Sequence, residues 1–276
     1  MQGHIAGYYE QANLWDRDLC KDPDEETRIV QAINVIPSDV RTVVDLGCGN
    51  GAFVNGLLGQ CSGRFGRVVG LDSSQEALRH VKAEAAQGSI AELPFEDESF
   101  DLVTCMETLE HLSQADFQRA VDEMQRVSRK YILLTVPNRE NLTRQLVMCP
   151  ECRCCFNPYF HVRSFDESRL RELLARFRPL RIENVGPCSR ERTYNTLAYG
   201  LRLMTGRRRP PAISVCPQCG FQQTEAEQSA TDRARTPTLF DHAVHAVKFL
   251  MGVVTPTQES SRWLLALYER QSPPIS

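Results

Sequence analysis

Short apolar runs alternate with segments of helical periodicity along residues 24–185, and this alternation restricts the chain to few folds. The runs at residues 43–46, 67–72, 100–106 and 131–136 have the length and composition of buried strands. Parallel strands need long crossover connections, and the helical segments between the runs supply them. The pattern therefore predicts an α/β fold with a doubly wound, mostly parallel sheet.

Two further strands are expected, one marked by Ile90 and one over residues 180–185. The predicted helices cover residues 24–36 and 51–60, start near Ser73 and Ser164 at capping boxes and near Ser113 and Asp116, and close the chain near 238–251 and 259–270. The helix after Ser164 has Phe177 on its apolar face and is expected to end before Pro179.

The chain divides into three parts by composition. We expect a helical lid over residues 1–38, whose aromatic side chains include Tyr9 and Trp15. The sheet core is expected over residues 39–186, and an irregular insert with C-terminal helices over residues 187–276.

A glycine turn follows the strand at residues 43–46. The missing side chains of Gly47 and Gly49 let a ligand approach the backbone, and the next helix offers free N–H groups. The turn also meets the relaxed dinucleotide fingerprint, so glycines alone do not separate one cofactor from another.

Carboxylates at the strand ends favour one cofactor over the other. Asp45, just before the glycine turn, would repel a pyrophosphate but attract a cation. Asp72 ends the next strand, where a carboxylate can accept hydrogen bonds from ribose hydroxyls. S-adenosylmethionine carries an ammonium and a sulfonium, so the pair favours it over NAD; simple capping of the strand ends is the other interpretation.

Four motifs resemble those of the class I S-adenosylmethionine-dependent methyltransferases. They occupy residues 43–51, 70–73, 92–103 and 107–112, in the family's order. The resemblance implies a Rossmann-like methyltransferase fold and S-adenosylmethionine as cofactor.

The resemblance also implies roles for single residues. The implied cofactor-binding residues are Asp45, Gly47 and Gly49 at the methionine end, Asp72 with Ser73 at the ribose, Ser89 and Ile90 at the adenine, and Met106 in the cleft. The family often has Asp where this chain has Ser89.

His111 is the candidate general base. It follows the fourth predicted strand, and its ordinary pKa of about 6.5 suits removal of a hydroxyl proton. A packing role at a helix start is an equally open interpretation.

Two C-P-x-C knuckles stand far apart in the chain. Cys149 with Cys152 and Cys216 with Cys219 resemble zinc-ribbon knuckles, and four thiolates make a closed, structural zinc site. The other interpretations are a redox pair, or one of these ligands replaced, the candidates being Cys154, Cys155 and His161.

Charge and composition bear on partners and location. The net charge is −3, and the N-terminus has no apolar stretch of the secretory kind, so we expect a cytoplasmic protein without a transmembrane segment. We expect O-methylation of a small molecule. One alternative is a methyltransferase of RNA or protein, which arginines such as those at 207–209 suggest and the acidic net charge disfavours. The other alternative is a non-catalytic binding module.

Overall fold

The computed structural model describes residues 2–16, 22–61, 63–192, 210–211, 214–222 and 257–271. The chain forms two compact units. The first comprises Met1–Tyr8, Asn141–His161 and Cys188–Ser260, and the second comprises Tyr9–Glu140, Val162–Pro187 and Ser261–Ser276. The three-part division at residues 38 and 186 remains a prediction.

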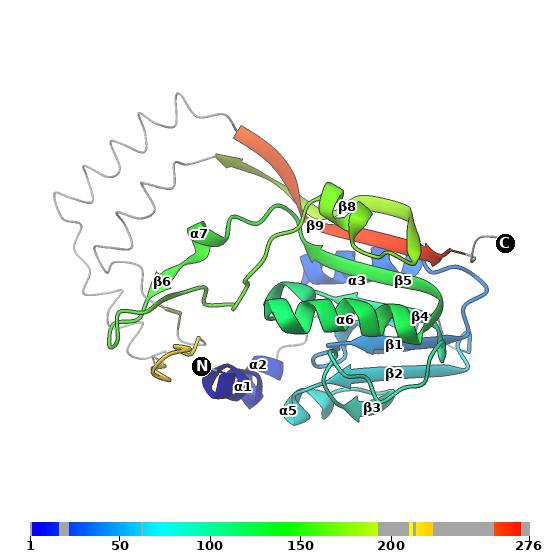
Figure 1. Ribbon diagram of the computed structural model, residues 1–276, viewed down its shortest axis with the longest axis horizontal. Helices are drawn as coiled ribbons and strands as arrows, with labels where there is room; N and C mark the ends of the chain where they lie inside the picture. The colour runs from blue at the N-terminus through cyan, green and yellow to red at the C-terminus, as the bar shows by residue number, and fades with distance from the viewer. Residues whose placement is uncertain are drawn as a thin grey trace. The chain divides into compact units, whose positions relative to one another are not determined.

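A seven-stranded sheet runs in the order β3-β2-β1-β4-β5-β9-β8 (Figure 1). The strands are β1 (Thr42–Leu46), β2 (Arg67–Asp72), β3 (Glu84–Gln87), β4 (Phe100–Met106), β5 (Ser128–Pro137), β8 (Phe177–Arg192) and β9 (Thr257–Arg270). The pairs among β1 to β5 are all parallel, while β9 pairs antiparallel with β5. The predicted doubly wound, mostly parallel sheet is confirmed.

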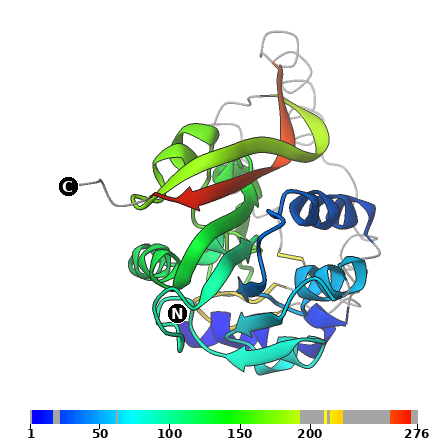
Figure 2. The ribbon, with the colours of Figure 1, turned by 90° about the vertical axis from the view of Figure 1, so that its right-hand side faces the viewer.

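Helices cover both faces of this sheet. The second unit holds α2 (Ala12–Trp15), α3 (Pro23–Asn34), α4 (Ala52–Gln60), α5 (Gln75–Leu78), the 3₁₀ turn η2 (Leu109–His111), α6 (Gln114–Val127) and α8 (Glu167–Glu172). Figure 2 shows α3 and α4 on one face and α6 on the other. Each face has its own buried cluster, because strands covered on both sides expose neither face.

Helix α6 shows why the sequence pattern worked here. The Ser113 side chain accepts a hydrogen bond from the Asp116 backbone N–H and so caps the helix. Phe117, Ala120 and Met124 recur at helical spacing and are buried against the sheet.

The smaller elements α1 (Gln2–Tyr9), α7 (Leu142–Gln145), β6 (Val147–Met148) and β7 (Cys155–Phe156) complete the described structure. Strands β6 and β7 pair antiparallel in a separate two-stranded sheet. Among the described residues, no helix has the length and apolar character needed to cross a membrane.

Several predicted element boundaries were wrong. The third strand is β3, and Ile90 lies after it as a buried side chain in a loop. Helix α5 is capped by Ser74 instead of Ser73, and α8 by Asp166 instead of Ser164. In both cases another Ser or Asp lies one or two residues further along the chain, and this later residue is the N-cap of the helix.

The end of α8 was also misplaced. Phe177 is the first residue of β8, and the helix ends at Glu172. Phe177 is still buried in the same apolar cluster as Leu170, which explains why its position fitted a helical face.

The predicted helix at 259–270 is wrong, because this segment is β9. Leu264, Ala266 and Tyr268 enter the cluster on one face of the sheet, whereas Trp263 and Leu265 enter the other. A continuous apolar run shows neither helical nor strand periodicity, so the sequence does not distinguish the two. Pairing with β5 makes this segment a strand. The other predicted C-terminal helix, at 238–251, lies outside the described residues.

Candidate functional site

The glycine turn, residues 47–51, links β1 to α4, and its glycines adopt left-handed backbone conformations. Gly47 and Gly49 have φ angles of 70° and 53°. A Cβ on Gly47 would overlap the Thr108 side chain, and one on Gly49 would lie 2.9 Å from the Trp15 ring. The turn therefore requires glycine at both positions for steric as well as conformational reasons.

Asp45 lies one residue before the end of β1 and is almost fully buried. Its Oδ1 accepts a hydrogen bond of 2.7 Å from the Thr104 hydroxyl. Burial raises the pKa of Asp45 to about 7, against the opposing effects of this hydrogen bond and of the Arg28 charge. A cation beside this carboxyl would hold it ionised.

Asp72 connects the end of β2 to the glycine turn. Its Oδ2 accepts from the Gly49 backbone N–H and its Oδ1 from that of Ser74, both at 2.8 Å. Burial raises the pKa of Asp72, although these backbone hydrogen bonds work against the shift. The neighbouring Ser73 is exposed.

The predicted adenine residues lie on the loop after β3. Ser89 is exposed, and its hydroxyl accepts a hydrogen bond from the Ala91 backbone N–H. Ile90 is buried in the apolar cluster of the α6 face. The structure thus separates them, with one side chain facing solvent and the other facing the core.

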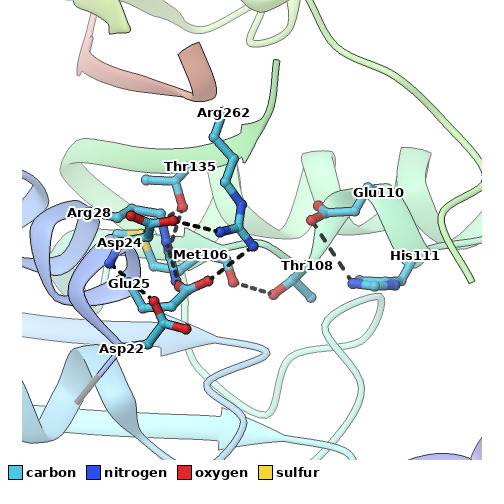
Figure 3. Close-up of polar contacts among 10 residues, drawn as sticks. All are labelled: Asp22, Asp24, Glu25, Arg28, Met106, Thr108, Glu110, His111, Thr135 and Arg262. Atoms are coloured by element: carbon cyan, nitrogen blue, oxygen red, sulfur yellow. Dashed lines mark hydrogen bonds and ion pairs between the residues drawn. The ribbon is translucent and has the colours of Figure 1, made fainter. Parts of the chain in front are cut away.

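Met106 ends β4 and belongs to a network that the sequence analysis missed (Figure 3). Arg28 on α3 donates a hydrogen bond of 2.9 Å to the Thr135 hydroxyl, which lies 3.5 Å from the Met106 sulfur. The same guanidinium donates to Glu25 and packs 5.3 Å from the Trp263 ring centroid.

Arg28 keeps its charge although it is buried. Burial opposes the charge, but the carboxylates of Glu107 and Glu25 raise the pKa of Arg28. The sequence could have indicated this buried arginine, because Arg28 lies one helical turn before Ala32 on the buried face of α3. A charged residue on an apolar helix face indicates a buried partner.

The acidic turn, residues 107–111, follows β4. Glu107 has a φ of 52°, a left-handed conformation that is uncommon outside glycine. Glu110 is fully buried. The predicted base, His111, ends the turn, with its Nδ1 3.2 Å from the Tyr9 hydroxyl and its Nε2 4.0 Å from Glu110 Oε1.

The first unit brings the four predicted cysteine ligands together, and we call them the cysteine cluster. The Sγ–Sγ distance is 3.6 Å for Cys149 with Cys219 and for Cys152 with Cys216, and all four sulfurs lie within 4.8 Å of one another. Tetrahedral ligands 2.3 Å from a zinc ion would stand about 3.8 Å apart.

The two knuckles repeat the same backbone hydrogen bonds. Cys149 N–H donates to the Cys154 carbonyl at 2.9 Å, and Cys216 N–H donates to the Phe221 carbonyl at 2.8 Å. The equivalent residues Arg153 and Gly220 both have positive φ, at 63° and 75°. Two distant segments with one shared geometry fit a common tetrahedral ion.

The remaining cysteines of this segment lie outside that arrangement. Cys154 Sγ is 3.7 Å from the Cys155 carbonyl, and Cys155 is exposed. Neither joins the cysteine cluster, and all the cysteines that the structure describes are free thiols.

Comparison with known proteins agrees with this geometry. Residues 44–132 match the family model described as a methyltransferase domain. A probable S-adenosylmethionine-dependent methyltransferase of Mycolicibacterium smegmatis is 34% identical over 142 residues, which cover 49% of this chain and 50% of that protein. A ubiquinone biosynthesis O-methyltransferase of Neisseria meningitidis is 28% identical over 133 residues, covering 40% and 52%. The chain spans about half the length of these curated relatives.

Solved structures share the fold at low identity. A chain of a complex that contains the Trm112 methyltransferase activator of Haloferax volcanii has a TM-score of 0.55 and 17% identity, covering 95% of this chain and 99% of that chain. An S-adenosylmethionine-dependent methyltransferase from Archaeoglobus fulgidus has a TM-score of 0.51 and 16% identity, covering 89% and 94%.

Sheet order, glycine turn and family match point to one class. Residues 44–132 match the model of a methyltransferase domain, and the sheet has the Rossmann-like fold of solved methyltransferases.

Proposed function

We propose that this protein transfers a methyl group from S-adenosylmethionine to an oxygen atom of a small molecule. The observation that carries the proposal is the convergence of Asp45, the glycine turn and Asp72 at the carboxyl ends of β1 and β2. In a doubly wound sheet this edge binds the ligand. The similarity to a ubiquinone biosynthesis O-methyltransferase supports oxygen as the acceptor atom.

Each group at this edge has a chemical task in the proposal. Asp45 holds the ammonium of the cofactor's methionine end, while the Arg28 charge favours the ionised form of Asp45. Asp72 accepts hydrogen bonds from the ribose, and Ser73, Ser89, Ile90 and Met106 border the remaining cofactor surface. When bound, the cofactor supplies a methyl group already activated by its sulfonium, so the protein mainly orients the reactants and excludes water.

Replacing Asp72 by alanine should weaken binding of S-adenosylhomocysteine by about 1–3 kcal/mol, because the ribose hydroxyls lose their acceptor. Calorimetry measures this directly. Asp122, exposed on α6, provides the matched control as Asp122→Asn. Unchanged affinity in Asp72→Ala would remove Asp72 from the ribose site, and tight binding of NAD to the native chain would contradict the choice of cofactor.

The acceptor is identified by incubating the protein with S-adenosylmethionine labelled in its methyl group and with separate fractions of metabolites, RNA and protein. We expect label in the metabolite fraction. Label in RNA or protein would favour a macromolecular acceptor, and cofactor binding without transfer to any fraction would favour a non-catalytic binding module.

We further propose that the cysteine cluster holds one structural zinc ion. Four thiolates leave no coordination position for water, which is the arrangement of structural sites and not of catalytic ones. The cysteines come from two segments of the first unit, so the ion would join them. The cytoplasm, a reducing compartment, would keep these thiols available.

A further inference from the structure

The side-chain amide of Asn157 has an unused donor. Asn157 follows β7 in the first unit, and only 7% of its surface is exposed. Its Nδ2 is buried and has no hydrogen-bond partner among the residues that the structure describes. Buried polar groups are nearly always hydrogen-bonded, because desolvation without a partner is costly. A bound molecule that accepts a hydrogen bond from Nδ2 would account for an asparagine at this position.

The orientation of this amide is fixed by a turn. Asn157 Oδ1 accepts a hydrogen bond of 2.9 Å from the Tyr159 N–H, and the Asn157 carbonyl accepts one of 3.0 Å from the Phe160 N–H. The first bond also identifies the side-chain oxygen, because the amide nitrogen does not accept from an N–H. Rotation of the amide would break the turn, so Nδ2 keeps its direction.

Buried aromatic rings lie on both sides of Asn157 in the chain. Phe156 precedes it and Phe160 closes the turn, and the two ring centroids lie 6.4 Å apart with planes inclined by 20°. The Tyr8 ring, also in the first unit, stands edge-on to Phe160 at a centroid distance of 4.9 Å. All three rings belong to buried residues. We call Tyr8, Phe156, Asn157 and Phe160 the amide–aromatic cluster.

The backbone of Phe160 is strained. Its φ is 61°, in the left-handed region that few bulky residues adopt. Glycine adopts this conformation without strain but would remove the ring. Strained residues persist where the surrounding structure enforces them, and they gather at ligand and active sites. The strain and the unused donor thus occur within one four-residue turn.

The proposed zinc site would hold this turn in place. Strand β7 begins at Cys155, soon after the first cysteine knuckle, and Phe156 pairs with Val147 on β6. The knuckle joins the same two strands, since the Cys149 N–H donates to the Cys154 carbonyl at 2.9 Å. An ion in the cysteine cluster would therefore fix the strand from which the Asn157 turn continues.

The chemistry of the amide–aromatic cluster limits its ligand. Aromatic rings favour contact with the edge or face of another ring, and an oxygen lone pair satisfies Nδ2. Burial raises the pKa of Tyr8 to about 12, so this hydroxyl is uncharged at neutral pH. A charged ligand would lose its hydration without gaining an opposite charge from these four residues. Aromatic walls with one fixed polar group are typical of small-molecule sites.

We propose that the amide–aromatic cluster binds an uncharged aromatic compound bearing an oxygen substituent, whose oxygen accepts a hydrogen bond from Asn157 Nδ2. The ring of the ligand packs against the rings of Phe156 and Phe160. Only binding is involved, and no covalent bond forms or breaks. The site does not depend on S-adenosylmethionine, and it therefore goes beyond the proposed function.

The first test observes the donor itself. In the full chain labelled with ¹⁵N-asparagine, nuclear magnetic resonance detects the Nδ2 protons, and Asn157→Ser identifies their signals. The probe is phenol; toluene lacks its oxygen, and cyclohexanol lacks its aromatic ring. We expect a progressive shift of the Asn157 signals with phenol and a much smaller one with either analogue. No shift with phenol, or an equal response to toluene or cyclohexanol, would overturn the proposal.

The second test uses variants of the turn. Asn157→Ser removes Nδ2, while the serine hydroxyl can still accept from the Tyr159 N–H. Its affinity for phenol should fall about tenfold, the effect of losing the hydrogen bond of a buried polar group. Phe160→Leu, which keeps Nδ2, should also bind phenol more weakly. Asn141→Ser, exposed in the same unit, is the matched control. Native affinity in Asn157→Ser or in Phe160→Leu would contradict the site.

A buried water is the other occupant to be tested. A water in a protein interior needs two to four polar partners, and the three rings supply few. Magnetisation transfer between water and the Nδ2 protons that persists when phenol is added would show that water alone occupies the site. All these measurements are made without S-adenosylmethionine. Failure of the cofactor to bind would therefore refute the proposed function and leave the aromatic site standing.

Discussion

Replacing His111 by alanine is expected to slow methyl transfer by about 10²–10⁴-fold, the usual effect of losing a positioned general base. The acceptor hydroxyl would then have to lose its proton to water, while the sulfonium donor and its orientation stay the same. The His111 ring contacts Tyr9 and faces Glu110, whereas the proposed cofactor residues lie on the glycine turn and β2. Cofactor affinity should therefore hardly change.

Single-turnover rates with the labelled acceptor and calorimetry with S-adenosylhomocysteine measure the two effects separately. His80→Ala is the matched control, because His80 is an exposed histidine. Full activity of His111→Ala would exclude His111 as the base and leave orientation as the main catalytic effect. A parallel loss of cofactor affinity would indicate that the variant disturbs the whole site.

Replacing Cys216 by serine is expected to release the zinc ion from a chain that otherwise carries about one zinc. Cys216 is fully buried and lies 3.6 Å from Cys152, so serine removes a central ligand of the cysteine cluster. Metal binding contributes directly to the folding free energy of small metal sites, by about 10–16 kcal/mol in zinc-finger peptides. The first unit should therefore become sensitive to protease, while the parallel strands β1 to β5 of the second unit stay folded.

Elemental analysis and limited proteolysis followed by mass spectrometry test this expectation. We expect the first cleavages within residues 141–161 and 214–222. The exposed Cys155 provides the control as Cys155→Ser, which should keep the metal. Native protein purified without chelator that contains no metal, or release of metal by substitution of Cys154 or Cys155, would contradict the proposed ligand set.

Four of the five parallel strands, β1, β2, β4 and β5, could be predicted because their signals are local. An apolar run that contains Asp45 and ends just before the glycine turn defines β1, and a similar run ending in Asp72 defines β2. Capping signals were less reliable. Ser73 and Ser74 offer the same hydroxyl, and only the backbone geometry at β2 decides which one begins α5.

The remaining features depend on contacts between residues that are far apart in the sequence. The segment 259–270 is a strand because β5 offers an edge to pair with, which its composition does not reveal. Arg28 reaches Thr135, a residue 107 positions away, and the pairs of the cysteine cluster are 64 and 70 positions apart.

The sequence by itself determined four of the five parallel strands (β1, β2, β4 and β5), the glycine turn, the carboxylates near the strand ends and the two cysteine knuckles. Each depends on spacing within a few residues, where backbone geometry is set by the local side chains. Only the tertiary structure decided that β9 joins the sheet, that Arg28 lies buried beside Met106 and that Glu110 is enclosed next to His111. These partners are brought together by packing between distant segments, and a local pattern can indicate a buried charge without identifying its partner.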